Sequence, residues 1–182
     1  MIEYLESTGT QYINTEYTVT ANSKFEIEYL LTDNPSDYQG IIYNSKSGVE
    51  NSSIGISKYR SIIASEIGNF RIETPIEANK KQYTYISKEK IVVNNETYIN
   101  NNEFIYSSTS NNKGLSVFAS TWSNTNYIYY IKAQLYYLKI YDSDTLVRDY
   151  IPVIDSTSRP CLFDKVGKEC YYNQGTGEFL YG

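Results

Sequence analysis

The sequence predicts an all-β protein, an antiparallel β-sandwich or jelly roll, on three observations. Short segments alternate β-branched or aromatic residues with polar ones. The connections between them are rich in Asn, Ser, Gly and Asp, the residues that favour turns. No stretch of helical length carries an apolar stripe, so helices should be minor. Many short strands without crossover helices are typical of antiparallel sandwiches.

The two ends of the chain show this pattern most clearly. Residues 4–15 alternate as an opening strand, and the glycines in Lys165–Lys168 and Asn173–Gly177 sit between apolar segments, which predicts consecutive hairpins. In chain order, strands are expected at about residues 4–15, 23–32, 40–45, 53–57, 61–65, 70–74, 82–87, 90–94, 115–121, 127–141, 146–154, 161–164, 169–172 and 178–180.

The long segment 127–141 does not alternate cleanly. Leu135 is out of phase with Leu138 and Ile140. A β-bulge would reconcile the two halves, and so would a strand covered on both faces. The polar block 107–113 is interpreted as a loop, because strands resume on both sides of it with unchanged composition. Residues 1–182 are therefore expected to form a single domain.

Composition argues against several classes of function. The net charge is -5 and the 16 Lys and Arg residues are scattered, whereas nucleic-acid binding needs a clustered basic surface. No run of 18 apolar residues would insert in a membrane, and residues 1–6 enter the first strand without a signal-peptide pattern. Histidine is absent, which removes the commonest general base and transition-metal ligand. Hydrolase triads and zinc sites are not expected.

The two cysteines flank the Lys165–Lys168 turn. A four-residue loop would place Cys161 and Cys170 directly opposite each other, where a disulfide is geometrically conceivable. The alternative is two small, half-buried apolar residues. The alternative is favoured, because nothing marks the chain as exported by an oxidising route. Neither interpretation gives the cysteines a catalytic role.

Tyrosine is unusually frequent, with 21 residues. Tyrosine is rigid and amphipathic, and sugar-binding sites stack pyranose rings on such side chains. The competing explanation is an AT-rich coding sequence, which raises Tyr, Asn, Ile and Lys together and accounts for most of the excess.

Several segments resemble, in order, the laminin-G-like, concanavalin A-like jelly-roll modules of bacteriophage and prophage tail and surface proteins. The resemblance covers almost the whole chain and rests on scaffold motifs, in which Arg148 and Asp149 are expected to have a structural role such as pairing across strands. The matching segments are Tyr4–Thr15, Gln82–Ile86, Lys90–Glu96, Ser116–Ala119, Tyr136–Asp142, Leu146–Pro152, Leu162–Asp164 and Asn173–Phe179.

Proteins of this architecture include lectins, adhesion domains and glucanases, so the resemblance leaves the function open. The glucanases carry a Glu-x-Asp-x-x-Glu strand, which places a nucleophile and an acid on one face. Here Glu26 and Glu28 share one face of a strand, but no Asp lies between them and no third carboxylate follows. They are interpreted as the solvated side of the strand, and no enzyme activity is expected.

The candidate binding residues lie in a polar loop around the only tryptophan. Trp122, Asn124 and Asn126 would combine an aromatic platform with amides, because a ring stacks on a sugar's apolar face while amides bond its hydroxyls. The alternative is that Trp122 folds back as a plug over one end of the sandwich.

A weaker candidate is a calcium site at a loop rim. Asp142 and Asp144 offer alternate oxygen ligands, but two carboxylates are too few for a calcium site to be assigned. A turn between Tyr141 and Leu146 is the favoured interpretation. No metal or other cofactor is therefore expected.

These features favour a non-catalytic, lectin-like module of a phage or prophage particle. It would be a tail-associated receptor-binding or adhesion component that recognises cell-surface glycan of a bacterial host, located on the virion or outside the cell. Shallow sugar sites need avidity, so display as a homo-oligomer is expected. The alternative is a structural decoration or tail assembly protein whose partners are other virion proteins. An endoglycosidase is disfavoured by the carboxylate argument.

Overall fold

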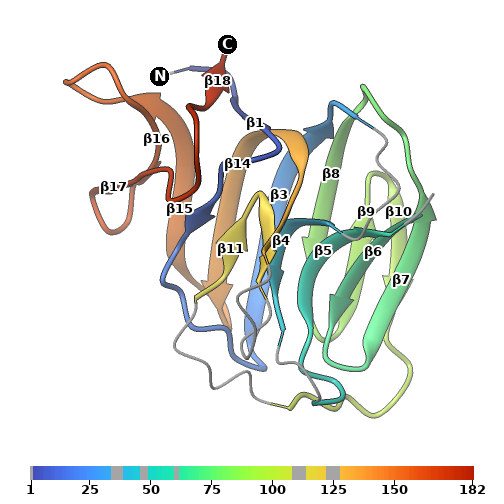
Figure 1. The fold of residues 1–182 in the computed structure, drawn as a ribbon. Coiled ribbons are helices and arrows are strands. Elements are labelled where there is room, and N and C mark those ends of the chain that lie inside the picture. The colour runs from blue at the N-terminus through green and yellow to red at the C-terminus, as the bar shows by residue number, and fades with distance from the viewer. Residues whose placement is uncertain (1, 34–38, 46–48, 60–61, 108–113, 122–127) are drawn as a thin grey trace.

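Two β-sheets form most of the protein, and every strand pairing among the described residues is antiparallel. The computed structural model describes residues 2–33, 39–45, 49–59, 62–107, 114–121 and 128–182 (Figure 1). No helix occurs in this part of the chain, and so none has the length and apolar character that a membrane crossing needs. The predicted all-β antiparallel sandwich is confirmed.

The larger sheet has ten strands. Its main path runs β10-β9-β8-β3-β14-β15-β16-β17, while β1 pairs with β14 and β18. The bounds are β10 Glu96–Ile99, β9 Lys90–Val93, β8 Lys81–Ile86, β3 Ser23–Leu31, β14 Lys132–Asp142, β15 Thr145–Ile154, β16 Pro160–Asp164, β17 Glu169–Tyr171, β1 Leu5–Thr8 and β18 Leu180–Tyr181.

The smaller sheet has six strands in the order β2-β11-β4-β5-β6-β7, and a separate two-stranded ribbon joins β12 to β13. Their bounds are β2 Ile13–Asn14, β11 Ser116–Val117, β4 Gln39–Asn44, β5 Ile54–Tyr59, β6 Ile62–Ile67, β7 Phe70–Pro75, β12 Ala119–Thr121 and β13 Ile128–Tyr130.

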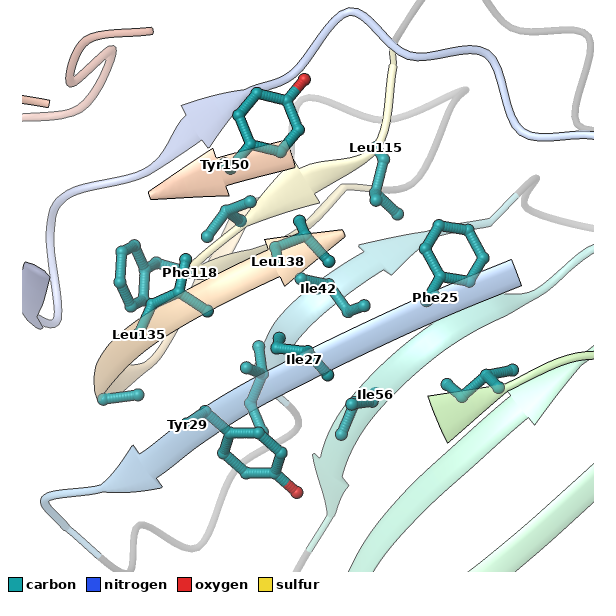
Figure 2. Packing of buried hydrophobic residues seen from close by; sticks show 14 of the residues in the cluster. Phe25, Ile27, Tyr29, Ile42, Ile56, Leu115, Phe118, Leu135, Leu138 and Tyr150 are labelled. Atoms are coloured by element: carbon teal, nitrogen blue, oxygen red, sulfur yellow. The ribbon is translucent and has the colours of Figure 1, made fainter. Parts of the chain in front are cut away.

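The core lies between the two sheets, and β3 shows how the sequence builds it. Phe25, Ile27 and Tyr29 alternate with polar residues and are fully buried. Ile42 and Ile56 belong to the six-stranded sheet and join the same hydrophobic cluster (Figure 2). Because alternate residues of a strand point to opposite faces, the polar residues of β3 face outward.

The opening segment 4–15 is two strands in two sheets, which corrects the predicted single strand. The chain turns at Gly9, whose φ of 102° lies in the region that glycine tolerates best. The buried Gln11 side chain holds this turn, because its Oε1 accepts a hydrogen bond of 2.8 Å from the backbone N–H of Thr8. The opening segment therefore links the two sheets, with β1 in the ten-stranded sheet and β2 in the six-stranded sheet.

Segments 115–121 and 127–141 are also divided. The buried Phe118 has a φ of 64°, and its N–H donates to the Ile41 carbonyl at 2.8 Å while its own carbonyl accepts from Ile131 at 3.1 Å. The second segment breaks at Ile131, between β13 and β14. Within β14 the register to β3 shifts between Leu135 and Tyr137, so the bulge alternative is the one observed.

The pairing role predicted for Arg148 and Asp149 is confirmed at the start of the β16–β17 hairpin. Arg148 Nε lies 3.5 Å from Asp164 Oδ2 on the neighbouring strand, and Lys165 Nζ lies 2.5 Å from Asp149 Oδ2. The fully buried Asp164 also accepts backbone N–H bonds from Asp149 at 2.9 Å and Val166 at 3.0 Å through Oδ1. This carboxylate fixes the entry of the chain into the hairpin.

The cysteines are not directly opposite, which corrects the expected register. Phe163 is the residue opposite Cys170, and Cys161 lies two positions further along β16. Both are free thiols, with Cys161 buried and Cys170 partly exposed. Burial, followed by a hydrogen bond with Cys170, raises the pKa of Cys161 to about 12. Cys161 is therefore an unreactive thiol at neutral pH.

The loop that precedes β16 should make stability sensitive to acid. Asp155 Oδ1 accepts N–H bonds from Arg159 at 3.0 Å and Thr157 at 2.8 Å, and Oδ2 accepts from the Tyr172 hydroxyl at 2.8 Å. These bonds, led by the Arg159 amide and the Thr157 hydroxyl, hold the pKa of Asp155 far below its usual range. Because the pKa of Asp155 is lower in the folded state, its ionised carboxylate stabilises the fold at pH values above the unfolded-state pKa of about 4. This stabilisation is lost as the pH falls towards the folded-state pKa.

We therefore expect Asp155→Asn to be less stable than the native protein at pH 7, with the difference narrowing as the pH falls below about 4. Urea unfolding followed by tyrosine fluorescence at a series of pH values measures this difference. A difference that stays constant down to about pH 2 would contradict the stabilising role of the ionised carboxylate.

Candidate functional site

The predicted binding residues Trp122, Asn124 and Asn126 lie outside the described residues.

The two aspartates of the calcium hypothesis, Asp142 and Asp144, lie in the described part of the chain. Ser143 and Asp144 form the turn between β14 and β15, and the Asp144 side chain is 96% exposed with Oδ1 2.8 Å from Lys24 Nζ. The ammonium group holds the pKa of Asp144 below its usual value. A calcium ion would have to displace Lys24, and among the described residues no cluster of three or more His, Cys, Asp or Glu could hold a metal.

A different set of residues gathers on the outer face of the ten-stranded sheet. We call it the tyrosine face and define it by four half-buried tyrosines that surround the outward side chains of β3. The sheet order places β3 between β8 and β14, as Figure 1 shows. The tyrosines of this face are Tyr83 and Tyr85 on β8, and Tyr137 and Tyr141 on β14.

Two glutamates of β3 lie between these tyrosines. Glu28 is paired with Tyr83 on one side and with Tyr137 on the other. Glu26, two positions earlier on the same face, is paired with Tyr85. The predicted shared face of the two glutamates is thus confirmed, and each lies beside at least one aromatic ring.

Glu26 is held by its neighbours on β14. The Tyr137 hydroxyl donates to Oε1 at 3.2 Å, the Tyr141 hydroxyl donates to Oε2 at 3.4 Å, and Lys139 Nζ lies 3.6 Å from Oε1. Burial, followed by the charge of Glu26, raises the pKa of Tyr137 and Tyr141. Both hydroxyls therefore stay protonated at neutral pH and donate to the Glu26 carboxylate.

A shallow depression opens beside the tyrosine face. It has a volume of about 430 Å³ and is lined by Glu28, Lys80, Lys81, Tyr83, Asn94 and Asn95. Asn94 is fixed at the β9–β10 turn, where it has a φ of 53° and its Oδ1 accepts the Tyr83 N–H at 3.0 Å. The exposed Asn95 forms the tip of this turn. The depression thus brings an aromatic ring, a carboxylate and amide groups together.

A second depression of about 400 Å³ lies at the open edge of the sandwich, between β7 and the β8–β10 segment. Both are lined by Lys80, Asn94 and Asn95, so they adjoin. Tyr98 and Glu96 line the far part of this second depression. The second depression also contacts Gln82 and Val93, which lie on the core side of β8 and β9, whereas the first lies on the outer side with Tyr83 and Glu28.

The tyrosine face and the depression beside it bring aromatic rings, carboxylates and amide groups together. Rings that stack on apolar sugar faces, combined with carboxylates and amides that bond hydroxyl groups, are the elements of carbohydrate recognition.

Sequence reasoning did not find the tyrosine face. It depends on the pairing of β3 with β8 and β14, segments separated by long stretches of sequence. A partial signal was present, because Tyr83 and Tyr85 are two positions apart and must share a face of β8.

The fold is an antiparallel β-sandwich. No protein-family model and no curated protein sequence matches the chain. Among solved structures, the chain resembles the CBM40 module of the Ruminococcus gnavus IT-sialidase, in complex with α2,3-sialyllactose. The two share 12% sequence identity and a TM-score of 0.56, over 77% of this chain and 89% of the module.

A second similar structure is a candidate carbohydrate-binding protein of Bacteroides ovatus. The identity is 12% and the TM-score 0.57, with all of this chain matched to 60% of the other protein, so the chain spans less than two thirds of that protein's length. At this level of identity both similarities establish the shared β-sandwich fold.

Proposed function

We propose that the protein is a non-catalytic carbohydrate-binding module, and that the tyrosine face and the depression beside it bind the glycan. One observation carries the proposal: Glu28 is the cross-strand neighbour of both Tyr83 and Tyr137, and it lines a depression with Tyr83, Asn94 and Asn95. The two similar structures support it, because one is a carbohydrate-binding module with a bound oligosaccharide.

The setting of this module is proposed on different grounds. The resemblance of its terminal segments to phage and prophage modules supports a role as a tail-associated receptor-binding or adhesion component, located on the virion or outside the cell. The ligand would then be surface glycan of a bacterial host. An open, shallow site supports display as a homo-oligomer. Binding without calcium or any other cofactor is also proposed, because Lys24 already neutralises Asp144.

The proposal is tested by calorimetric titration of the purified protein with bacterial cell-wall glycans, in the presence of EDTA. We expect saturable binding that Tyr83→Ala weakens by about fivefold, because a lost stacking ring costs on the order of 1 kcal/mol. Tyr83→Phe keeps the ring and should bind nearly as the native protein does. Tyr181→Ala removes a tyrosine that is 48% exposed on β18 and should change nothing.

The same titration separates the alternatives. Binding that is lost in Trp122→Ala and kept in Tyr83→Ala would place the site at the tryptophan loop, as the sequence predicted. Binding that appears only when calcium replaces EDTA would restore the Asp142 and Asp144 hypothesis. An absence of binding to every glycan, together with capture of another virion protein, would overturn the proposal in favour of a structural role.

A further inference from the structure

The tyrosine face already binds ammonium groups of the protein itself. Lys139 Nζ lies 5.2 Å from the centre of the Tyr137 ring and 3.6 Å from Glu26 Oε1, so one cation is shared by a ring and a carboxylate. Lys90 Nζ lies 5.4 Å from the centre of the Tyr85 ring. Ammonium groups over aromatic rings are stabilised by the ring quadrupole, and a nearby carboxylate adds to this attraction.

Tyr83 and Glu28 form a second pair of the same kind. They are cross-strand partners, as Tyr85 and Glu26 are one pair further along β3 and β8. Among the described residues, no ammonium or guanidinium group lies within ion-pair distance of Glu28 or over the Tyr83 ring. Both side chains line the depression beside the face, so a ligand reaches them.

The two lysines of the depression are committed to other partners. Lys80 Nζ lies 3.0 Å from both carboxylate oxygens of Glu77. Lys81 Nζ lies 3.4 Å from Glu3 Oε1 and 3.7 Å from the centre of the Tyr136 ring. Each therefore has a carboxylate partner of its own, and among the described residues neither forms an ion pair with Glu28.

We infer that Tyr83 and Glu28 receive a protonated amine, and that the glycan bound here carries unacetylated amino sugars such as glucosamine. This inference rests on the proposed function and specifies its ligand class. At Tyr83 and Glu28 the glucosamine ammonium would occupy a position equivalent to that of Lys139 Nζ at Tyr137 and Glu26. The sugar ring would lie over Tyr83. The net charge of -5 also disfavours acidic glycans, in contrast to the sialyllactose bound by the similar CBM40 module.

The test compares two oligosaccharides of equal length, one of glucosamine and one of N-acetylglucosamine, titrated calorimetrically into the native protein and into Glu28→Gln. We expect the native protein to prefer the glucosamine oligomer by about fivefold, as for a partly exposed ion pair, and to lose the preference as salt is raised. Glu28→Gln should bind both equally. Glu103→Gln, an exposed glutamate elsewhere, should keep the preference.

The outcomes separate this inference from the proposed function. Equal binding of the two oligomers by the native protein, or a preference that survives in Glu28→Gln, would overturn the amine site and leave carbohydrate binding intact. Binding of neither oligomer, with binding of another cell-wall glycan, would overturn the inference alone. Binding of no glycan at all would remove both. Circular dichroism of each variant confirms that the fold is kept.

Discussion

Asp164→Ala is expected to cost about 3 kcal/mol or more of the free energy of unfolding, because it breaks a buried charge network. Asp164 is fully buried, accepts the N–H groups of Asp149 and Val166, and faces Arg148 across the strand pair. Truncation leaves two amide donors without their acceptor and a guanidinium without its counter-charge. Urea unfolding monitored by circular dichroism measures the loss.

Asp144→Ala is the matched control for this variant. It also removes an aspartate that contacts a cation, but the Asp144 side chain is 96% exposed and pairs only with Lys24 among the described residues. Surface ion pairs contribute roughly 0–1 kcal/mol, so its effect should be small. Equal losses in the two variants would show that burial of Asp164 is not the source of its importance.

Gly55→Ala should destabilise the protein by a similar amount, about 3 kcal/mol or more, for a steric reason. Gly55 has a φ of 129°, which is accessible to glycine and strained for other residues. A Cβ at this position would lie 2.1 Å from the carbonyl oxygen of Ile42, which belongs to the backbone of the neighbouring strand. Relief of the clash requires the two central strands β4 and β5 to separate.

Ser57→Ala, two positions along the same strand, provides the comparison. Ser57 is fully buried, and its hydroxyl has no hydrogen-bond partner among the described residues. Its removal should change the unfolding free energy by less than about 1 kcal/mol. If Gly55→Ala proved as mild as Ser57→Ala under thermal and urea unfolding, the close approach of β4 and β5 at this point would be wrong.

The alternation of polar and apolar residues was sufficient to predict a strand that has one face on the core. Polar and apolar residues alternate from Lys24 to Tyr29, and burial in β3 follows that alternation. The pattern did not predict where the chain changes sheets. Phe118, at the break between β11 and β12, is apolar like its neighbours Val117 and Ala119, so the break leaves no mark in the sequence. Strand β10 was not expected, since Glu96–Ile99 is mostly exposed and forms only through its pairing with β9.

The candidate site was less accessible to sequence reasoning than the fold. Glu26 and Glu28 were assigned to one face of a strand, and this is correct. Their tyrosine neighbours lie on β8 and β14, which are far from β3 in the sequence. A single sequence does not show which residues of these strands pair with β3. Trp122 stays a prediction, because it lies outside the described residues.

The division of the opening segment between two sheets has a consequence for the order of folding. The Gln11 amide donates to the carbonyl of Glu178 at 3.0 Å and the Thr10 hydroxyl to that of Thr176 at 2.9 Å, across 167 and 166 residues of sequence. Contacts of such separation form late, because loop closure must precede them. During synthesis, the turn between the first two strands therefore forms its final contacts only after Thr176 and Glu178 have left the ribosome.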